Sequence, residues 1–261
     1  MSRFSSSYGW QPDLPDHRDF IYSAQAETLQ LLPSKVDLRP NCPPVYDQGQ
    51  LGSCTANAIG AAFEFELRKQ KAPDFMPSRL FIYYNERAME NTINSDSGAQ
   101  IRDGIKSVNK QGVCPETMWK YVISEFAQKP HAVCYDDALT HLVTSYHRVT
   151  QTAEQVKGCL AEGYPVVFGF TVYESFESAA VAKSGVLNMP AKGEQTVGGH
   201  AVAAVGYDDK EKRFIIRNSW GADWGMKGYF TMPYNYLLNA KLADDLWTIR
   251  LTMSNPAIKK K

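Results

Sequence analysis

The sequence predicts an α+β protein with a mainly helical first half and a mainly β-strand second half. In the first half, apolar residues recur every three or four positions, as on one face of an amphipathic helix. In the second half, they alternate or run in short bursts between turns rich in glycine and aspartate. We therefore expect two packed parts with a cleft where they meet, which 261 residues of 44% hydrophobic composition can support.

Residues 1–31 are expected to form an extension outside the core fold. They include a loop-like stretch from Trp10 to Phe20, in which two prolines and scattered charges oppose regular structure. Aromatic residues such as Trp10, Phe20 and Tyr22 are nevertheless apolar enough to dock on a surface. We expect the extension either to lie across the cleft and restrain activity or simply to stabilise the fold.

The helical part is expected over residues 32–145. Its clearest element begins at Ser53, a residue type suited to an N-cap, and runs for four to five turns to about Leu67. Further helices are predicted at residues 78–89, 101–110, 136–142 and, beyond this part, 154–161.

The β part is expected over residues 146–261, with strand-like sequence starting at about Val143. Strands are predicted at residues 164–172, 200–207, 213–217 and 246–251.

Composition limits the classes of partner. Lysine plus arginine equals aspartate plus glutamate, 28 against 28, so net charge gives no reason to expect nucleic acid or an anionic membrane. No run approaches the roughly 18 apolar residues of a spanning helix, and residues 1–20 lack the apolar core of a signal peptide. We expect a monomer that is cytoplasmic or exported by a non-classical route.

The five cysteines form an odd set without a closely spaced pair: Cys42, Cys54, Cys114, Cys134 and Cys159. This spacing argues against a structural zinc site and against a dense disulfide framework. We expect no metal and no cofactor, and at least one thiol without an intrachain disulfide partner.

Cys54 is the best candidate for a nucleophile. It follows Gly52 and Ser53 at the start of the predicted helix, where unpaired backbone N–H groups and the helix dipole stabilise a thiolate. A cysteine on an apolar helix is, taken alone, more often a small buried hydrophobe. The assignment therefore depends on its partners.

His200 is the candidate proton partner, because histidine can hold and return a proton near neutral pH. It follows Gly198 and Gly199 and begins an apolar strand, which predicts an imidazole at the edge of a sheet with small neighbours. An ordinary strand-edge histidine would look the same. The other four histidines occupy the extension or surroundings without a motif: His17, His131, His141 and His147.

Asn218 opens the stretch Asn-Ser-Trp-Gly-Ala-Asp-Trp-Gly-Met-Lys-Gly-Tyr, directly after a predicted strand. Its side-chain carbonyl can accept the imidazole N–H and fix the ring, while the indole of Trp220 shields that bond. The tryptophans can also be simple core aromatics. Gln48, six residues before Cys54, can offer its amide N–H groups and, with the Cys54 N–H, form an oxyanion hole.

Together these segments resemble the papain family of cysteine peptidases. The matching motifs run from Gln48 to Cys54, from Gly199 to Tyr207 and from Asn218 to Tyr229. In that family the histidine and asparagine follow the cysteine by roughly 130 to 150 residues; here the intervals are 146 and 164. The likeness extends from about residue 32 to about residue 253.

Two departures from the family pattern stand beside the nucleophile. Leu51 occupies the place where most members carry a cysteine, so the disulfide usual there cannot form. Thr55 replaces the aromatic residue that usually follows the nucleophile, so packing under the helix must differ. With its short extension, the chain is similar to bacterial-type, non-secretory members.

The resemblance implies a papain-like fold, in which a helical domain and a β-barrel-like antiparallel domain have the active site in the groove between them. It implies that Cys54 attacks a peptide carbonyl, that His200 protonates the leaving amine, and that water hydrolyses the thioester. Asn218 would orient His200, and Gln48 would stabilise the oxyanion. Peptide or protein substrates follow. The extension is far shorter than the family's usual inhibitory propeptide, so its role as an intramolecular inhibitor of a zymogen is a separate hypothesis, which rests on its length and its anchoring aromatic residues.

The residues that bind substrate are expected to include Gly98, Gly199 and Trp220, the first by its similarity to a glycine-containing loop of the family. Two other functions remain open. Cysteine, histidine and asparagine also serve transglutaminases, transpeptidases and amidases, because any thioester route can use them. A fold of this kind can also lose activity and only recognise peptides.

Overall fold

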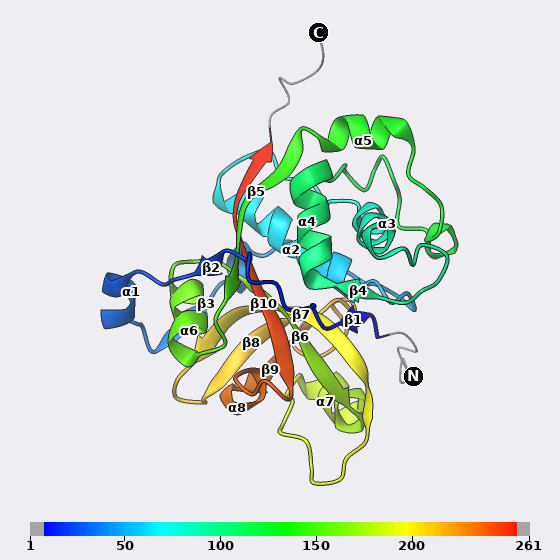
Figure 1. Cartoon of the computed structure of the whole chain (residues 1–261). Helices are drawn as coiled ribbons and strands as arrows, with labels where there is room; N and C mark the ends of the chain where they lie inside the picture. Colours follow the sequence, from blue (N-terminus) through cyan, green and yellow to red (C-terminus); the bar gives the residue numbers. More distant parts are fainter. Residues whose placement is uncertain (1–7, 255–261) are drawn as a thin grey trace.

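In the computed structural model, which describes residues 8–254, a group of helices packs against one large sheet (Figure 1). Residues 1–7 of the predicted extension and 255–261 of the predicted β part lie outside the described residues. The helices are α1 (Ala26–Gln30), α2 (Cys54–Lys69), α3 (Arg79–Glu90), α4 (Ile101–Gln111), α5 (Ala132–Ala138), α6 (Ala153–Ala161), α7 (Ala179–Ser184) and α8 (Tyr234–Leu237). The strands are β1 (Trp10–Gln11), β2 (Ile21–Tyr22), β3 (Lys35–Asp37), β4 (Ala99–Gln100), β5 (His141–Val149), β6 (Val166–Tyr173), β7 (Thr196–Asp208), β8 (Arg213–Arg217), β9 (Tyr229–Pro233) and β10 (Ala243–Ser254).

Helix α2 lies at the centre of the molecule, between the other helices and the sheet. Every residue from Cys54 to Leu67 is buried, as expected of a helix covered on all sides. The predicted helix start is confirmed, but the Ser53 side chain makes no capping bond. Its hydroxyl instead lies 2.5 Å from the Tyr121 hydroxyl and accepts a bond from the Asn57 amide at 3.1 Å.

The helices predicted at 78–89, 101–110 and 154–161 are confirmed as α3, α4 and α6 within a residue or two. The helix predicted at 136–142 is misplaced, because α5 ends at Ala138 and strand β5 begins at His141. β-Branched and aromatic residues follow there, and they pair with β10 along the length of β5.

The large sheet has the strand order β2-β5-β10-β6-β7-β8-β9, and β3 also pairs with β7. Its pairings are antiparallel except between β2 and β5. The α+β class is therefore confirmed, whereas the expected β-barrel-like domain is an open sheet, since no pairing joins β2 to β9 among residues 8–254.

Strand β7 begins at Thr196, four residues earlier than predicted. His200 therefore lies within the strand, opposite Phe170 of β6, rather than at its first residue. Strand β8 pairs with β7 only from Ala203 onward. Near His200, the β7 backbone therefore pairs with β6 but not with β8. The strands predicted at 213–217 and 246–251 lie within β8 and β10, the one predicted at 164–172 begins two residues before β6, and β9 was not predicted.

The described part of the extension belongs to the fold rather than lying outside it. Strand β1 pairs in parallel with β4 of the helical part, and β2 pairs in parallel with β5 of the sheet. Figure 1 shows this dark-blue segment crossing the junction between the helices and the sheet. Of the aromatic residues expected to dock, Tyr22 is buried, Trp10 is partly buried and Phe20 is exposed.

Candidate active site

Cys54 and His200 meet where the first turn of α2 faces β7. The Ala201 N–H, next along the chain from His200, donates to the Cys54 Sγ at 3.3 Å. Neither the Cys54 nor the His200 side chain has measurable exposed surface. The structure thus brings together two residues that are 146 positions apart in the sequence.

Asn218 contacts the imidazole at its ring edge, through the Nε2 atom. The His200 Nε2 and Asn218 Oδ1 atoms are 2.8 Å apart, and the same oxygen accepts from the Ser219 N–H at 2.9 Å. Because Nε2 is engaged in this way, Nδ1 is the ring nitrogen left to exchange a proton, and it has no partner among the described residues. Trp220 stacks on the imidazole, with ring centroids 5.1 Å apart and planes 29° apart.

Gln48 connects the loop before Cys54 to the segment that carries Asn218. Its Nε2 donates to the Leu51 carbonyl at 2.9 Å, and its Oε1 accepts from the Ser219 hydroxyl at 2.6 Å. The side chain is fully buried. One amide hydrogen is therefore used within the loop, and the second is the one that an oxyanion could use.

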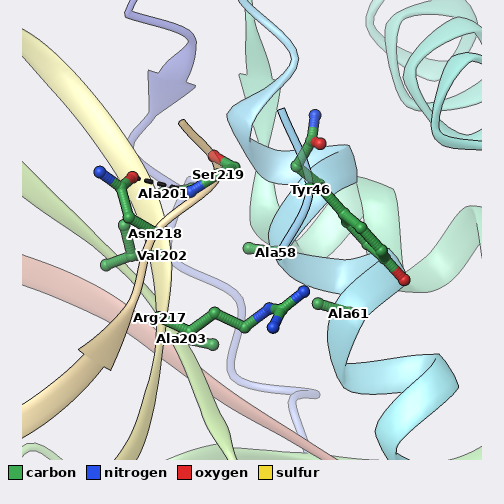
Figure 2. Close-up of a pocket in the computed structure, with 10 residues that line it drawn as sticks. Tyr46, Ala58, Ala61, Ala201, Val202, Ala203, Arg217, Asn218 and Ser219 are labelled. Carbon is green, nitrogen blue, oxygen red and sulfur yellow. Dashed lines mark hydrogen bonds between the residues drawn. The ribbon is translucent and has the colours of Figure 1, made fainter. Parts of the chain in front are cut away.

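Small residues form the wall behind the site. Figure 2 shows Ala58 and Ala61 of α2 facing the stretch from Ala201 to Ala203 of β7, with Asn218 and Ser219 above them. Arg217 fills the lower end of this wall, and its guanidinium donates to the Pro43 carbonyl at 2.7 Å. Alanines on both sides let the helix approach the strand closely, which fixes the position of the nucleophile relative to the histidine.

We call residues 8–31, the described part of the extension, the N-terminal segment. Its first residues lie directly over this site. The Gly9 carbonyl, directly before β1, accepts from the Ala99 N–H of β4 at 2.7 Å. A Cβ atom at Gly9 would overlap the carbonyl oxygen of Gly52, and one at Gly98 would overlap Gly9. The Tyr8 ring meets His200 edge-on, with centroids 5.8 Å apart.

All three predicted substrate-binding residues are therefore covered by this segment. Gly98 contacts Gly9, and Gly199 contacts Trp10. The Trp220 and Tyr8 ring centroids are 6.3 Å apart.

Burial shifts the pKa values of Cys54 and His200 in this covered state. It raises the pKa of the Cys54 thiol to about 12, although the backbone N–H groups of Ala201 and Gly9 act in the opposite direction. Burial also lowers the pKa of His200 to about 4, against the opposing effect of the hydrogen bond that His200 donates to the Asn218 Oδ1. At neutral pH the pair is thus a thiol and a neutral imidazole, and burial outweighs the thiolate stabilisation expected at the helix start.

Two acidic residues that the sequence did not identify support the nucleophile loop. Both carboxylate oxygens of Asp96 lie 3.0 Å from the Gly52 nitrogen, and Asp96 also accepts from the Tyr83 hydroxyl. The buried Glu86 accepts from the Thr55 hydroxyl at 2.6 Å, and burial raises the pKa of its carboxyl well above the usual value. Threonine after the nucleophile is thus accommodated by a polar contact, a pairing that sequence spacing could not indicate.

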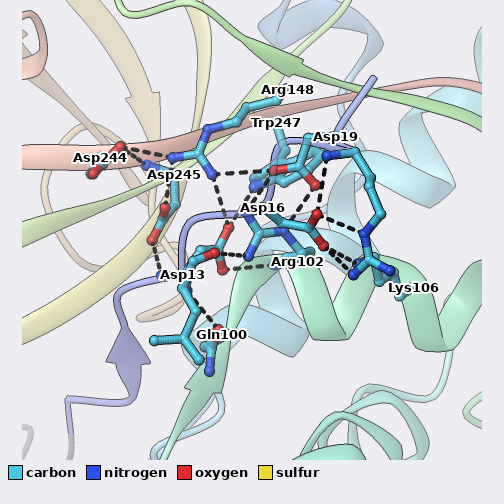
Figure 3. Close-up of polar contacts among 12 residues, drawn as sticks. Asp13, Asp16, Asp19, Gln100, Arg102, Lys106, Arg148, Asp244, Asp245 and Trp247 are labelled. Atoms are coloured by element: carbon cyan, nitrogen blue, oxygen red, sulfur yellow. Dashed lines mark hydrogen bonds and ion pairs between the residues drawn. The ribbon is translucent and has the colours of Figure 1, made fainter. Parts of the chain in front are cut away.

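A cluster of charged residues anchors the segment to the rest of the protein (Figure 3). Asp19 makes a two-bond ion pair with Arg102 of α4, at 3.0 and 2.6 Å. Asp13, whose side chain has no exposed surface, accepts from the Arg102 N–H at 3.0 Å and from the Trp247 indole at 2.8 Å. Burial, followed by the nearby Asp245, raises the pKa of Asp13 to about 7.

All five cysteines lie within the described residues, and all are free. Over the same residues, no group of three or more histidine, cysteine, aspartate or glutamate side chains could hold a metal ion. None of the helices in residues 8–254 is both long and apolar enough to cross a membrane.

Comparison with known proteins gives one family and several relatives. The family described as "Papain family cysteine protease" matches residues 32–246. An uncharacterized peptidase C1-like protein of Acanthamoeba polyphaga mimivirus is 44% identical over 95% of this chain and 88% of its own length. Cysteine proteinase 3 of Entamoeba histolytica is 30% identical over 78% of this chain, which spans 64% of that longer protein.

Solved structures have the same fold. Xylellain, a cysteine protease from Xylella fastidiosa, superposes with a TM-score of 0.90 at 48% identity, covering 94% of this chain and 96% of its own. Digestive procathepsin L 3 of Tenebrio molitor gives a TM-score of 0.75 at 20% identity, over 95% of this chain and 77% of its own, a likeness of fold alone.

Proposed function

The chain belongs to the papain family of cysteine proteases, and from this premise we propose that Cys54, His200, Asn218 and Gln48 hydrolyse peptide bonds under the restraint of the N-terminal segment. The observation that carries the assignment is the hydrogen-bonded arrangement of Cys54, Ala201, His200 and Asn218 at one point of the fold.

In the first half of the reaction, the Cys54 Sγ attacks the peptide carbonyl carbon. His200 takes the thiol proton at Nδ1 and gives it to the leaving amine as the carbon–nitrogen bond breaks. The Cys54 N–H and the second amide hydrogen of Gln48 stabilise the oxyanion. In the second half, His200 takes a proton from water, the hydroxide attacks the thioester, and the thiol leaves with the proton returned.

Asn218 keeps the imidazole in the orientation that this proton transfer requires. Its oxygen fixes Nε2 as the nitrogen that carries a hydrogen toward it, which leaves Nδ1 facing the reaction. Trp220 covers the ring and limits access of water to the bond.

Three observations support restraint by the segment. It covers Gly98 and Gly199 and packs against His200. An ion pair between Asp19 and Arg102 anchors the segment, and each of these two side chains is only 5% exposed. Cys54 and His200 also have no exposed surface in this state, and burial raises the pKa of the thiol and lowers the pKa of the imidazole, which favours the neutral forms.

The test compares full-length variants, because the buried anchors make the segment part of the fold. A Gly9→Leu substitution places a side chain where the Gly52 carbonyl lies, so residues 8–10 cannot dock while Asp13 and Asp19 stay anchored. We expect wild type to cleave an unstructured protein and a pool of fluorogenic peptides slowly under reducing conditions, Gly9→Leu to cleave them faster, and Gly9→Leu/Cys54→Ala to be inactive. Leu14→Ala, a change to an exposed side chain of the same segment, is the matched control.

Each outcome separates one part of the proposal from the rest. Activity that survives Cys54→Ala would remove the nucleophile assignment. A Gly9→Leu variant no more active than wild type, with unchanged Cys54 alkylation, would contradict restraint. A folded Gly9→Leu variant with alkylation increased but no hydrolysis would favour another acyl-transfer reaction or a peptide-binding module.

A further inference from the structure

Tyr121 lies in the loop between α4 and α5 and reaches the loop that carries the nucleophile. Its hydroxyl donates to the Gln48 carbonyl at 2.9 Å and lies 2.5 Å from the Ser53 hydroxyl. Gln48 carries the side-chain amide proposed for the oxyanion, and Ser53 directly precedes Cys54, whose backbone N–H is the second donor. One phenol oxygen is therefore bonded beside both oxyanion donors.

The bonds around Tyr121 form a chain with a single direction. The Gln48 carbonyl can only accept, so the Tyr121 hydroxyl hydrogen must point to it. The Ser53 hydroxyl then donates to the phenol oxygen, and the Asn57 amide donates to the Ser53 hydroxyl at 3.1 Å. Each hydrogen is used once, from Asn57 on α2 through to Gln48.

Arg79 fixes the ring of Tyr121 against the nucleophile helix. Its guanidinium carbon lies 3.9 Å from the ring centroid, and its Nη1 donates to the Asn57 Oδ1 and to the Asp47 carbonyl, both at 3.0 Å. Two bonds to Glu116, at 2.9 and 2.8 Å, hold the guanidinium itself. A side chain locked by its neighbours in this way can fix the position of a functional group.

The two groups that Tyr121 bonds belong to fully buried residues. Neither Gln48 nor Ser53 has exposed surface, whereas Tyr121 is partly buried. Without the phenol hydroxyl, the Gln48 carbonyl and the Ser53 hydroxyl would need new partners inside the protein, and an unpaired buried group is costly. Loss of this one hydroxyl should therefore shift the loop from Gln48 to Ser53 rather than leave it in place.

We propose that Tyr121 is a positioning residue for the reaction, which holds Gln48 and the start of α2 at the separation that lets both donors reach one oxyanion. The proposal rests on the proposed function, because the oxyanion belongs to that reaction. Tyr121 acts through Gln48 and Cys54 and does not bind the peptide. Donors aimed at developing charge stabilise the transition state more than the bound substrate, so a small shift of one donor weakens catalysis without preventing binding.

The first experiment measures an oxyanion adduct in the full-length Gly9→Leu background. The probes are tripeptide aldehydes ending in leucinal, phenylalaninal or argininal. The Cys54 sulfur adds to the aldehyde carbon, the thiol proton passes to the former carbonyl oxygen, and that oxygen takes the place of the oxyanion. Binding is read as protection of Cys54 from iodoacetamide, whose alkylation of the sulfur forms no oxyanion. Tyr121→Phe should weaken aldehyde binding about tenfold while the alkylation rate without aldehyde is unchanged.

Two further variants accompany Tyr121→Phe. Tyr135→Phe is the matched control, because it removes a hydroxyl that donates to the Asn85 Oδ1 at 3.0 Å between α5 and α3, and it should leave aldehyde binding unchanged. Ser53→Ala breaks the same chain one bond earlier and should weaken aldehyde binding by a similar factor. The double variant should bind no more weakly than the more affected single variant, because both remove one chain. Ser53→Ala also decides the question if Tyr121→Phe does not fold.

Hydrolysis gives a second readout in the same background. Tyr121→Phe should lower kcat about tenfold and change KM by less than about twofold, because peptide binding does not use the oxyanion donors. Unchanged aldehyde binding, additive losses in the double variant, or a parallel fall in aldehyde binding and alkylation would each overturn the proposal. Failure of the proposed function is recognised separately, in a Gly9→Leu parent whose Cys54 is alkylated but which neither hydrolyses peptides nor is protected by any aldehyde; the role of Tyr121 would fall with it.

Discussion

The indole of Trp220 stacks against the imidazole of His200, with ring centroids 5.1 Å apart, and is itself held edge-on by Trp224 at 5.2 Å. This arrangement covers the 2.8 Å contact between His200 and Asn218. A hydrogen bond shielded from water is stronger than the same bond in solvent, so the orientation of the ring is more tightly fixed.

Replacing Trp220 should therefore reduce turnover rather than binding. In the Gly9→Leu background, Trp220→Ala should lower kcat about tenfold, equivalent to about 1.4 kcal/mol of barrier, because water reaches the Asn218 contact. Trp220→Phe, which keeps an aromatic cover, should lose less. Peptide hydrolysis measures both variants, and an unchanged kcat in Trp220→Ala would show that the indole only packs.

The covered thiol should respond to pH differently from an uncovered one. With a Cys54 pKa of about 12, the thiolate fraction in wild type keeps rising about tenfold per pH unit through pH 8 to 10. In Gly9→Leu the thiol gains access to water, so its alkylation should level off near or below the ordinary cysteine pKa of about 8.5. Stopped-flow labelling between pH 6 and 10 distinguishes the two profiles; parallel profiles would mean that burial by the segment does not set the reactivity.

Asp13 should make stability depend on pH in a defined direction. Its pKa is raised by burial from 3.8 to about 7, so the folded state holds a proton that the unfolded state releases. The stability that this group contributes is complete below about pH 4 and is lost as the pH rises through about 7. The Tm of wild type minus that of Asp13→Asn should therefore fall across this range.

Thermal melts at half-unit pH steps measure that difference. The exposed Glu211→Gln variant serves as the control for removal of a carboxylate. A wild-type-minus-variant Tm that stays constant from pH 4 to 8 would contradict the assignment.

Asp96 should position the loop that carries the nucleophile. Its carboxylate accepts hydrogen bonds from the Gly52 N–H and the Tyr83 hydroxyl. The same hydroxyl accepts a bond from the Gly98 N–H at 3.2 Å. Asp96→Ala in the Gly9→Leu background should lower kcat/KM about tenfold, because charge-assisted bonds to a backbone N–H are stronger than neutral ones. Asp96→Asn keeps one acceptor and should recover part of the loss, whereas equal loss in both variants would indicate a different cause.

Local sequence patterns predicted the elements that build the site. Helix α2 was found because its apolar face repeats over four turns, and the strands of the second half because their residues alternate. The meeting of Cys54, His200 and Asn218 followed from motif order, since no local pattern relates residues so far apart. The helix placed at 136–142 failed because β-strand pairing with β10 decides the conformation from His141 onward.

The contacts of the N-terminal segment could not be read from the sequence. Its prolines and charges suggested a loop, yet Asp13 and Asp19 are among its most buried side chains because Arg102 and Arg148 meet them. Long-range pairing of this kind leaves no periodic signal. The same reason explains why Asp96, Glu86 and Asp245 were not identified in advance.

Part of the contact between the segment and the active-site loops is made through glycine, since a Cβ atom at Gly9 would overlap the Gly52 carbonyl and one at Gly98 would overlap Gly9. Such a contact tolerates almost no substitution, since any added carbon separates the two surfaces while the remaining catalytic groups stay in place. If the segment restrains the enzyme, substitution at Gly9 should therefore release activity rather than abolish it.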